Sequence, residues 1–270
     1  MDNRPIGVFD SGIGGLTVVK EMLKFLPNEE IVYFGDTARV PYGTKSKDTV
    51  TRFALECIRF LNKRKVKMIV IACNTVSASS LPEIRKKISI PVQGVITPGA
   101  RAAVAVTKTK KIGVIGTERT ISSGAYIEAI KSLDPETQIY SKACPLFVPL
   151  VEEGWLDDDV TYLAAEKYLN PLKQYEIDTL VLACTHYPLL KGVLKKVMGD
   201  GVILVDSATE TAKAVKQTID SLKIQRTIET LPQHKFFVSD TPDKFVKVGE
   251  MFLGRKMDFI QKINTEEYVY

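Results

Sequence analysis

Short apolar runs alternate with amphipathic stretches from the N-terminus to about residue 206, and this alternation constrains the fold more than any other feature. Runs of four or five apolar residues suit strands that are buried on both faces, and the stretches between them carry apolar residues at helical spacing. The pattern predicts an α/β fold with parallel strands joined by crossover helices. The expected strands are residues 6–9, 31–34, 68–72, 92–95, 112–115, 138–141, 180–183 and 202–205.

The two halves of the chain resemble each other. Residues 6–8 (IGV) recur as IGV at 112–114, and residues 71–73 (IAC) recur as LAC at 182–184. Buried parallel strands look alike, so one match means little, but four strands recur in the same order at nearly one offset. We therefore predict two similar parallel-sheet domains related by internal pseudo-symmetry, with the active site in the cleft between them.

The segment from Ser207 onward has no counterpart in either half. An apolar stripe predicts one helix soon after Ser207, and Thr241-Pro242 predicts the start of another. We expect this segment to fold back onto the first half. The expected domains are residues 1–97 together with 207–270, and residues 98–206.

Charge and hydropathy exclude several classes of protein. Lys and Arg number 37 against 32 Asp and Glu, and this excess of +5 is dispersed rather than gathered into the stripe typical of nucleic-acid binding. No apolar stretch approaches the ~20 residues of a membrane span, and the N-terminus lacks the apolar region of a signal peptide. We therefore expect a cytoplasmic protein without nucleic-acid or membrane partners.

The four cysteines, Cys57, Cys73, Cys144 and Cys184, form no C-x-x-C pair, and the chain has only two histidines. This spacing predicts neither a metal site nor a disulfide framework. Cys57 lies on a helical apolar stripe, which indicates core packing. Cys73 and Cys184 instead end equivalent strands of the two halves, where ligands of parallel sheets bind.

A thiol at such a strand end admits two interpretations. Plain burial is common for a single cysteine. Polar residues follow both cysteines, however, and Asn74 or Thr75 could cap a helix after Cys73, while Pro188 suits a first helical turn after Cys184. A helix N-terminus lowers the pKa of a nearby thiol. Two thiols facing each other across a cleft suit two-base chemistry, in which one removes a proton from carbon and the other delivers one to the opposite face.

Five motifs in order resemble glutamate racemase. They are residues 7–16 (GVFDSGIGGL), 33–43 (YFGDTARVPYG), 72–75 (ACNT), 152–155 (EEGW) and 183–189 (ACTHYPL). The resemblance implies a cofactor-independent, pyridoxal-independent racemase of two α/β domains that interconverts L- and D-glutamate and supplies D-glutamate for bacterial peptidoglycan. Glutamate is then the expected small-molecule partner, and we also expect a homodimer.

By position, the resemblance implies that Cys73 removes the α-proton of D-glutamate and that Cys184 removes that of L-glutamate. Asp10 would assist at Cys73, and Glu152 and His186 would assist at Cys184. The implied substrate-binding residues are Asp10, Ser11, Tyr42, Gly43, Asn74, Thr75, Thr117, Thr185 and His186.

The residues alone leave several of these roles open. His186 could be a structural histidine, and Asp10 could be a helix N-cap. Spacing does not choose between Glu152 and Glu153; only the resemblance does. Arg39, the one guanidinium inside a motif, could be an ordinary surface charge.

Three rival functions remain. Gly12-x-Gly14 with a later Asp36 partly matches a dinucleotide-binding fingerprint, but Thr17 occupies its third glycine position. Cys73 and Cys184 could form a reversible disulfide as a thiol switch. A related racemase could act on aspartate or another carbon acid, because two-cysteine geometry does not select the substrate.

Overall fold

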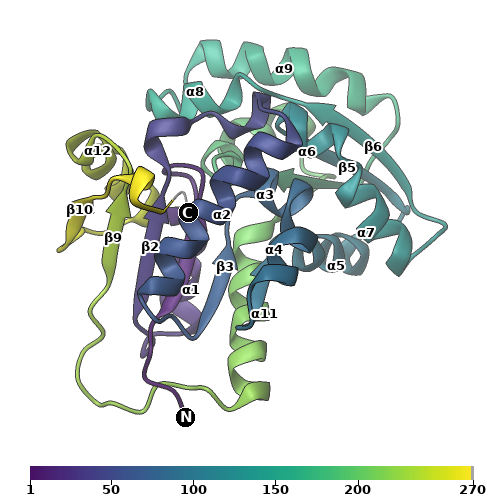
Figure 1. Cartoon of the computed structure of the whole chain (residues 1–270). Coiled ribbons are helices and arrows are strands. Elements are labelled where there is room, and N and C mark those ends of the chain that lie inside the picture. Colours follow the sequence, from purple (N-terminus) through teal and green to yellow (C-terminus); the bar gives the residue numbers. More distant parts are fainter. Residues whose placement is uncertain (269–270) are drawn as a thin grey trace.

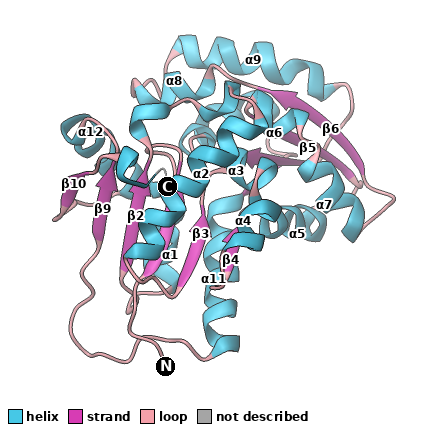
Figure 2. Ribbon diagram, in the orientation of Figure 1, coloured by secondary structure: helices cyan, strands magenta, loops and turns pink. Residues whose placement is uncertain are grey.

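The structure is a computed structural model, and it describes residues 1–268 apart from the side chain of Lys244. The described residues form a six-stranded and a four-stranded sheet, and every strand pairing in them is parallel (Figures 1 and 2). The prediction of an α/β fold with two parallel sheets is confirmed.

The first sheet has the strand order β10-β9-β2-β1-β3-β4. Its strands are β1 (Ile6–Asp10), β2 (Ile31–Gly35), β3 (Met68–Ile71), β4 (Val92–Gly94), β9 (Lys235–Val238) and β10 (Ile260–Lys262). The second sheet has the order β6-β5-β7-β8. Its strands are β5 (Lys111–Gly116), β6 (Gln138–Ala143), β7 (Thr179–Ala183) and β8 (Ile203–Asp206).

The two sheets share one strand arrangement. In each, the first strand in the chain is central, the second lies on one side, and the third and fourth lie on the other. Thus β1 corresponds to β5 and β3 to β7, so the recurring tripeptides of the sequence occupy equivalent strands. The pseudo-repeat is therefore a repeat of topology.

Helices cover the faces of the sheets, as crossover connections require. The α-helices are α1 (Leu16–Phe25), α2 (Lys47–Lys63), α3 (Asn74–Ser79), α4 (Leu81–Lys87), α5 (Ile96–Val106), α6 (Glu118–Ser122), α7 (Ala125–Leu133), α8 (Phe147–Glu152), α9 (Asp159–Lys173), α10 (Lys191–Met198), α11 (Ser207–Leu222) and α12 (Pro242–Leu253). Short 3-10 turns are η1 (Thr37–Arg39), η2 (Tyr42–Thr44), η3 (Tyr187–Leu190) and η4 (Thr265–Tyr268). No described helix is long and apolar enough to cross a membrane.

The C-terminal segment returns to the first sheet. Helix α11 packs against α1 and α5, and the chain then passes beneath the first sheet, near the N-terminus, to reach β9 (Figure 1). Strand β9 pairs with β2, and β10 pairs with β9. The division into residues 1–97 with 207–270 and residues 98–206 stays a prediction. The sequence prediction missed β9 and β10.

One buried apolar cluster joins the two halves. It includes Leu16 of α1, Leu182 of β7 and Val215 of α11, all of which are fully buried. The close packing of these side chains fixes the two sheets relative to each other, so that the carboxyl ends of their strands face the same region. The polar residues that follow β1, β3, β5 and β7 are thereby brought together.

Candidate active site

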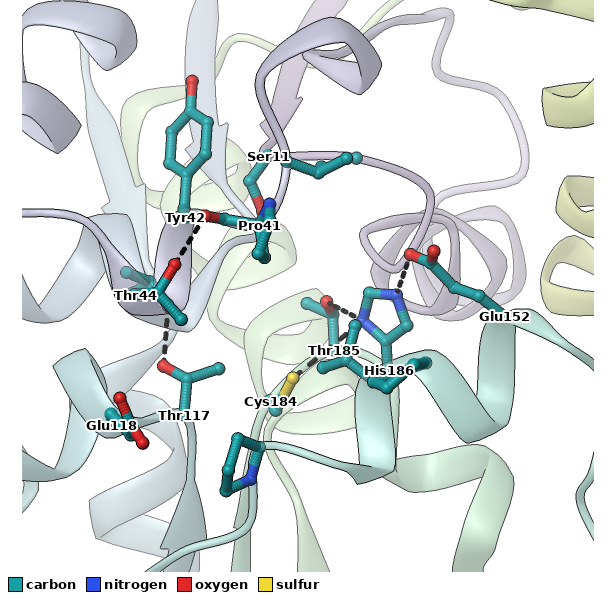
Figure 3. A pocket seen from close by; sticks show the side chains of 17 residues that line it. Ser11, Pro41, Tyr42, Thr44, Thr117, Glu118, Glu152, Cys184, Thr185 and His186 are labelled. Atoms are coloured by element: carbon teal, nitrogen blue, oxygen red, sulfur yellow. Dashed lines mark hydrogen bonds and ion pairs between the residues drawn. The ribbon is translucent and has the colours of Figure 1, made fainter.

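A cavity of about 330 Å³ lies where the carboxyl ends of the two sheets meet (Figure 3). The first half contributes Ser11, Gly12, Val40, Pro41, Tyr42, Gly43, Thr44 and Thr75 to its wall. The second half contributes Thr117, Glu118, Pro145, Val148, Pro149, Glu152, Cys184, Thr185 and His186. Ligand pockets typically have volumes of about 300–1,000 Å³, so the cavity suits a small molecule.

Cys184 belongs to a row of three side chains on one side of the cavity. It follows β7 directly, and its Sγ lies 3.9 Å from Nδ1 of His186. Nε2 of the same imidazole lies 3.0 Å from Oε1 of Glu152, at the end of α8 (Figure 3). Burial alone would lower the pKa of His186, but hydrogen bonds to Cys184 and Glu152 outweigh burial and raise the pKa to about 10.

The predicted helix N-terminus at Cys184 is only partly present. Cys184 is followed by Thr185 and His186, and the 3-10 turn η3 starts at Tyr187. Pro188 lies in that turn, as predicted, but α10 begins only at Lys191. The imidazole, rather than a helix terminus, is therefore the group that faces this thiol.

Cys73 lies deeper than Cys184. It occupies the N-cap position of α3, is 5% exposed, and donates a hydrogen bond from Sγ to Oγ of Ser11 at 3.3 Å. Ser11 and Thr75 line the cavity, whereas Cys73 is not among the described residues that do. The expectation of a lowered thiol pKa is wrong here, because burial and the neighbouring Asp10 raise the pKa of Cys73 to about 12, against the hydrogen bond with Ser11.

Asp10 is fully buried beside Cys73 and shapes the turn that follows β1. Its Oδ2 accepts a hydrogen bond from the amide of Gly12 at 3.0 Å, so it does not cap α1, whose N-cap residue is Gly15. Burial raises the pKa of Asp10, although the charge of His186 and the Gly12 amide oppose the shift. None of the described residues hydrogen-bonds to Oδ1, which leaves one buried oxygen available.

Asn74 does not cap α3, contrary to the prediction, because it is the first residue of the helix itself. Its Oδ1 accepts a hydrogen bond from the Tyr126 hydroxyl of α7 at 2.7 Å, which joins the two halves of the molecule. Within residues 1–268, Nδ2 of Asn74 has no hydrogen-bond partner. Buried polar groups are normally satisfied, so this amide is a donor with unused capacity, although Asn74 is not among the described residues that line the cavity.

Three threonines complete the polar wall. Oγ1 of Thr75 lies 3.0 Å from Oγ1 of Thr117. The Thr117 hydroxyl also accepts a hydrogen bond from the amide of Thr120 and so caps α6. The main-chain oxygen of Thr185 accepts a hydrogen bond from Thr17 at 3.1 Å. The structure thus places the three predicted threonines, one from the first half and two from the second, at the cavity.

Tyr42 and Gly43 contribute main chain rather than side chain. The Tyr42 ring points away from Cys184, and its hydroxyl donates a hydrogen bond to Asp36 (Figure 3). A Cβ on Gly43 would lie 2.7 Å from Cβ of Thr117, so the backbone here approaches the opposite half more closely than a side chain allows. At Tyr42 and Gly43 the turn therefore presents backbone groups to the cavity.

Several wall residues were not predicted as site residues. Val40, Pro41 and Thr44 flank the predicted Tyr42-Gly43 turn, and Glu118 follows Thr117. Gly12 follows the predicted Ser11, and Pro145, Val148 and Pro149 follow β6. Because β6 corresponds to β2, the three residues after β6 are the second half's equivalent of the turn after β2, and the pseudo-repeat was the signal that could have found them.

Two like-arranged parallel sheets that share a cavity, with a thiol ending the corresponding strand of each, define a class of two-lobed α/β proteins with paired cysteines. Residues 6–215 match the Asp/Glu/hydantoin racemase family, and the chain belongs to this family. The resemblance indicated by the five motifs is therefore confirmed.

Individual relatives agree with the family match. The chain is 53% identical over 263 residues to the glutamate racemase of Geobacter metallireducens, and the match covers 97% of each chain. The crystal structure of glutamate racemase from Francisella tularensis in complex with D-glutamate has a TM-score of 0.94 at 42% identity, covering 99% of this chain and 100% of that one. The structure of Escherichia coli glutamate racemase in complex with L-glutamate and the activator UDP-MurNAc-ala has a TM-score of 0.80 at 29% identity, covering 96% and 98%.

Proposed function

We propose that this protein is a glutamate racemase that interconverts L- and D-glutamate without a cofactor, using Cys73 and Cys184 as the two acid–base groups. The observation that carries the proposal is the Cys184–His186–Glu152 row on one side of the cavity, with a second thiol at the matching strand end of the other half. The two enantiomers named in the structures of the relatives support glutamate as substrate.

In the proposed reaction, the Cys184 thiolate takes the α-proton of L-glutamate, and the Cys73 thiol gives its proton to the opposite face of the carbanion. The reverse reaction exchanges these roles, so each thiol acts once as base and once as acid. His186, 3.9 Å from Sγ, is positioned to stabilise the Cys184 thiolate, and Glu152 orients the imidazole. Asp10, beside Cys73, would assist the second thiol.

We propose that Ser11 moves to bring Cys73 into contact with the substrate. The Ser11 hydroxyl accepts the hydrogen bond of the Cys73 thiol and itself lines the cavity. We propose that a substrate carboxylate takes the Ser11 hydroxyl as its donor, which turns this side chain and exposes Sγ of Cys73. The raised pKa of Cys73 fits a thiol that starts as the proton donor.

Neutral donors would bind the two carboxylates of glutamate. The described residues that line the cavity include neither Lys nor Arg, but they include the hydroxyls of Ser11, Thr75, Thr117 and Thr185. The Asn74 amide adds a buried donor without a partner. Hydroxyls and main-chain amides bind carboxylates through hydrogen bonds that are strengthened by the ligand's charge.

The same resemblance supports a role in supplying D-glutamate for peptidoglycan. The activator named with the Escherichia coli enzyme, UDP-MurNAc-ala, carries the muramyl sugar of that polymer. We further propose a cytoplasmic homodimer, for which sedimentation of the purified protein is the direct measurement.

Heavy water tests the proposed reaction. Incubation with L-glutamate in D₂O without added cofactor should place deuterium at the α-carbon, while the circular dichroism of the amino acid decays to zero. Starting from D-glutamate, the circular dichroism signal should begin with the opposite sign and also decay to zero. Racemisation that requires added pyridoxal phosphate, or α-deuteration of aspartate in place of glutamate, would contradict the proposal.

A further inference from the structure

The turn that contributes Pro41, Tyr42 and Gly43 to the cavity is held from behind by a buried carboxylate. Asp36 follows β2, is fully buried, and does not belong to the cavity wall. Its Oδ2 accepts hydrogen bonds from the Tyr42 hydroxyl and from Nε of Arg39, the latter at 2.7 Å. The side chain of Tyr42 is thus an anchor for the turn.

Arg39 compensates two carboxylates at once. Its guanidinium also pairs with Glu56 of α2, whose side chain is 5% exposed, and it lies 4.1 Å from the centre of the Phe53 ring. The Arg39 side chain is only 19% exposed, so the interpretation as an ordinary surface charge is wrong. Removing one partner of a buried ion pair leaves an uncompensated charge, which is costly.

The C-terminal return completes this arrangement. Oγ of Ser239, just after β9, donates to Oδ1 of Asp36 at 2.8 Å and accepts the amide of Ala38 at 2.8 Å. Thr37 and Asp240 exchange two further hydrogen bonds, both within 2.8 Å. The C-terminal segment, which has no counterpart in the pseudo-repeat, therefore holds residues 36–38 in place, just before the turn at the cavity.

We propose that Arg39 is a positioning residue for substrate binding, which holds the main chain of the Pro41–Gly43 turn in place through Asp36 and the Tyr42 hydroxyl. Arg39 is not among the described residues that line the cavity, so it acts on substrate binding through the turn that it holds. Ser239 supports the same carboxylate from the C-terminal segment. The inference rests on the proposed function of the cavity, because it concerns the affinity of that site for glutamate.

Arg39→Met tests the inference in the full-length protein. We expect KM for both glutamate enantiomers to rise about tenfold with a much smaller change in kcat, because the turn binds substrate but does not transfer the proton. Adding Glu56→Gln to Arg39→Met neutralises one of the two carboxylates that Arg39 pairs with. The raised KM should then fall part of the way back to the wild-type value. Ser239→Ala, a milder change, should raise KM in the same direction.

Two variants separate positioning from general loss of stability. Arg226→Met removes another buried guanidinium, which pairs with Glu30 and donates hydrogen bonds to the main-chain oxygens of Asn28, Ile228 and Thr230, near the amino end of β2 and outside the cavity wall. It should lower the unfolding temperature without changing KM. In a Tyr42→Phe background the anchor is already broken, so adding Arg39→Met should cause no further rise in KM.

Hydrogen exchange of the peptide covering residues 36–44 distinguishes failure of this inference from failure of the proposed function. Faster exchange there in Arg39→Met, together with a raised KM, supports positioning. An unchanged KM and unchanged exchange in a racemase-active protein would overturn it. If the wild type does not racemise glutamate, the proposed function fails, and unchanged exchange in Arg39→Met would reject the anchor as well.

Discussion

The carboxylate of Glu152 lies 3.0 Å from Nε2 of His186, on the opposite side of the imidazole from Cys184. Glu152 ends α8 and His186 follows β7, so packing between separate elements sets this relationship. A carboxylate on one ring nitrogen determines which proton the other nitrogen carries and stabilises the imidazolium. The pair therefore controls the charge that faces the Cys184 thiol.

Glu152→Gln should lower kcat/KM by about 10²-fold, in the range typical of impaired acid–base catalysis. L- and D-glutamate have equal free energies in water, so kcat/KM must fall equally in both directions. Initial rates from each enantiomer check both statements. Glu153→Gln alters the exposed neighbouring carboxylate and is the matched control; it should leave kcat/KM unchanged, and an equal loss in both variants would contradict the assignment.

The raised pKa of His186 also makes stability depend on pH. A histidine whose pKa is about 10 in the folded protein and 6.5 in the unfolded chain stabilises the fold fully below pH 6.5. That contribution is lost as the pH rises through about 10. The stability difference between wild type and His186→Gln, measured by urea unfolding, should therefore narrow between pH 6.5 and 10; a gap that widens over this range would contradict the shift.

Alternation of apolar runs was enough to predict the strands of both sheets up to β8, because buried parallel strands leave a strong local pattern. Strands β9 and β10 lie in the C-terminal segment, outside the pattern that recurs in the two halves, so no repeat pointed to them. The position of β9 beside β2, and of β10 beside β9, depends on tertiary packing, which no local pattern reports.

The rule that ligands lie beyond the carboxyl ends of parallel strands led to Ser11, Thr75 and Cys184, and these three residues line the cavity. It could not predict that Cys73 lies deeper than its counterpart, because depth depends on the side chains packed around it. The orientation of Asn74 was equally hidden, since its partner, Tyr126, comes from the other half of the chain.

The two strand-end thiols should be individually essential. Cys73→Ala or Cys184→Ala should abolish racemisation in both directions, because each turnover needs a base on one face of the carbon and an acid on the other. Cys144→Ala is the control, since Cys144 is a buried free thiol outside the cavity wall. The Cys144→Ala variant should lose about 1 kcal/mol of stability because the substitution leaves a small cavity. It should still racemise glutamate, as followed by the circular dichroism of the amino acid. Full activity in Cys73→Ala would refute the two-thiol mechanism.

Tyr126→Phe should raise KM for glutamate about fivefold, because loss of one buried hydroxyl frees the Asn74 amide to rotate. Steady-state rates at saturating and limiting glutamate separate this effect from a change in kcat. Thr211→Val deletes another buried hydroxyl bond, to the main-chain oxygen of Ser207 in α11, and serves as control. A rise in KM in both variants would indicate a general effect of destabilisation.

Gly14→Ala should impair catalysis through the close approach of the two halves. The added Cβ would lie 2.2 Å from Oγ1 of Thr185 and 2.5 Å from Nδ1 of His186, so these two side chains must shift from their present positions. We expect at least a tenfold loss of kcat and a stability loss of about 1–3 kcal/mol from overpacking. Gly192→Ala in α10 is the matched substitution, because its Cβ would meet no described atom within 4 Å. It should keep full activity and gain up to about 1 kcal/mol from helix propensity, whereas full activity in Gly14→Ala would show that the imidazole position is not critical.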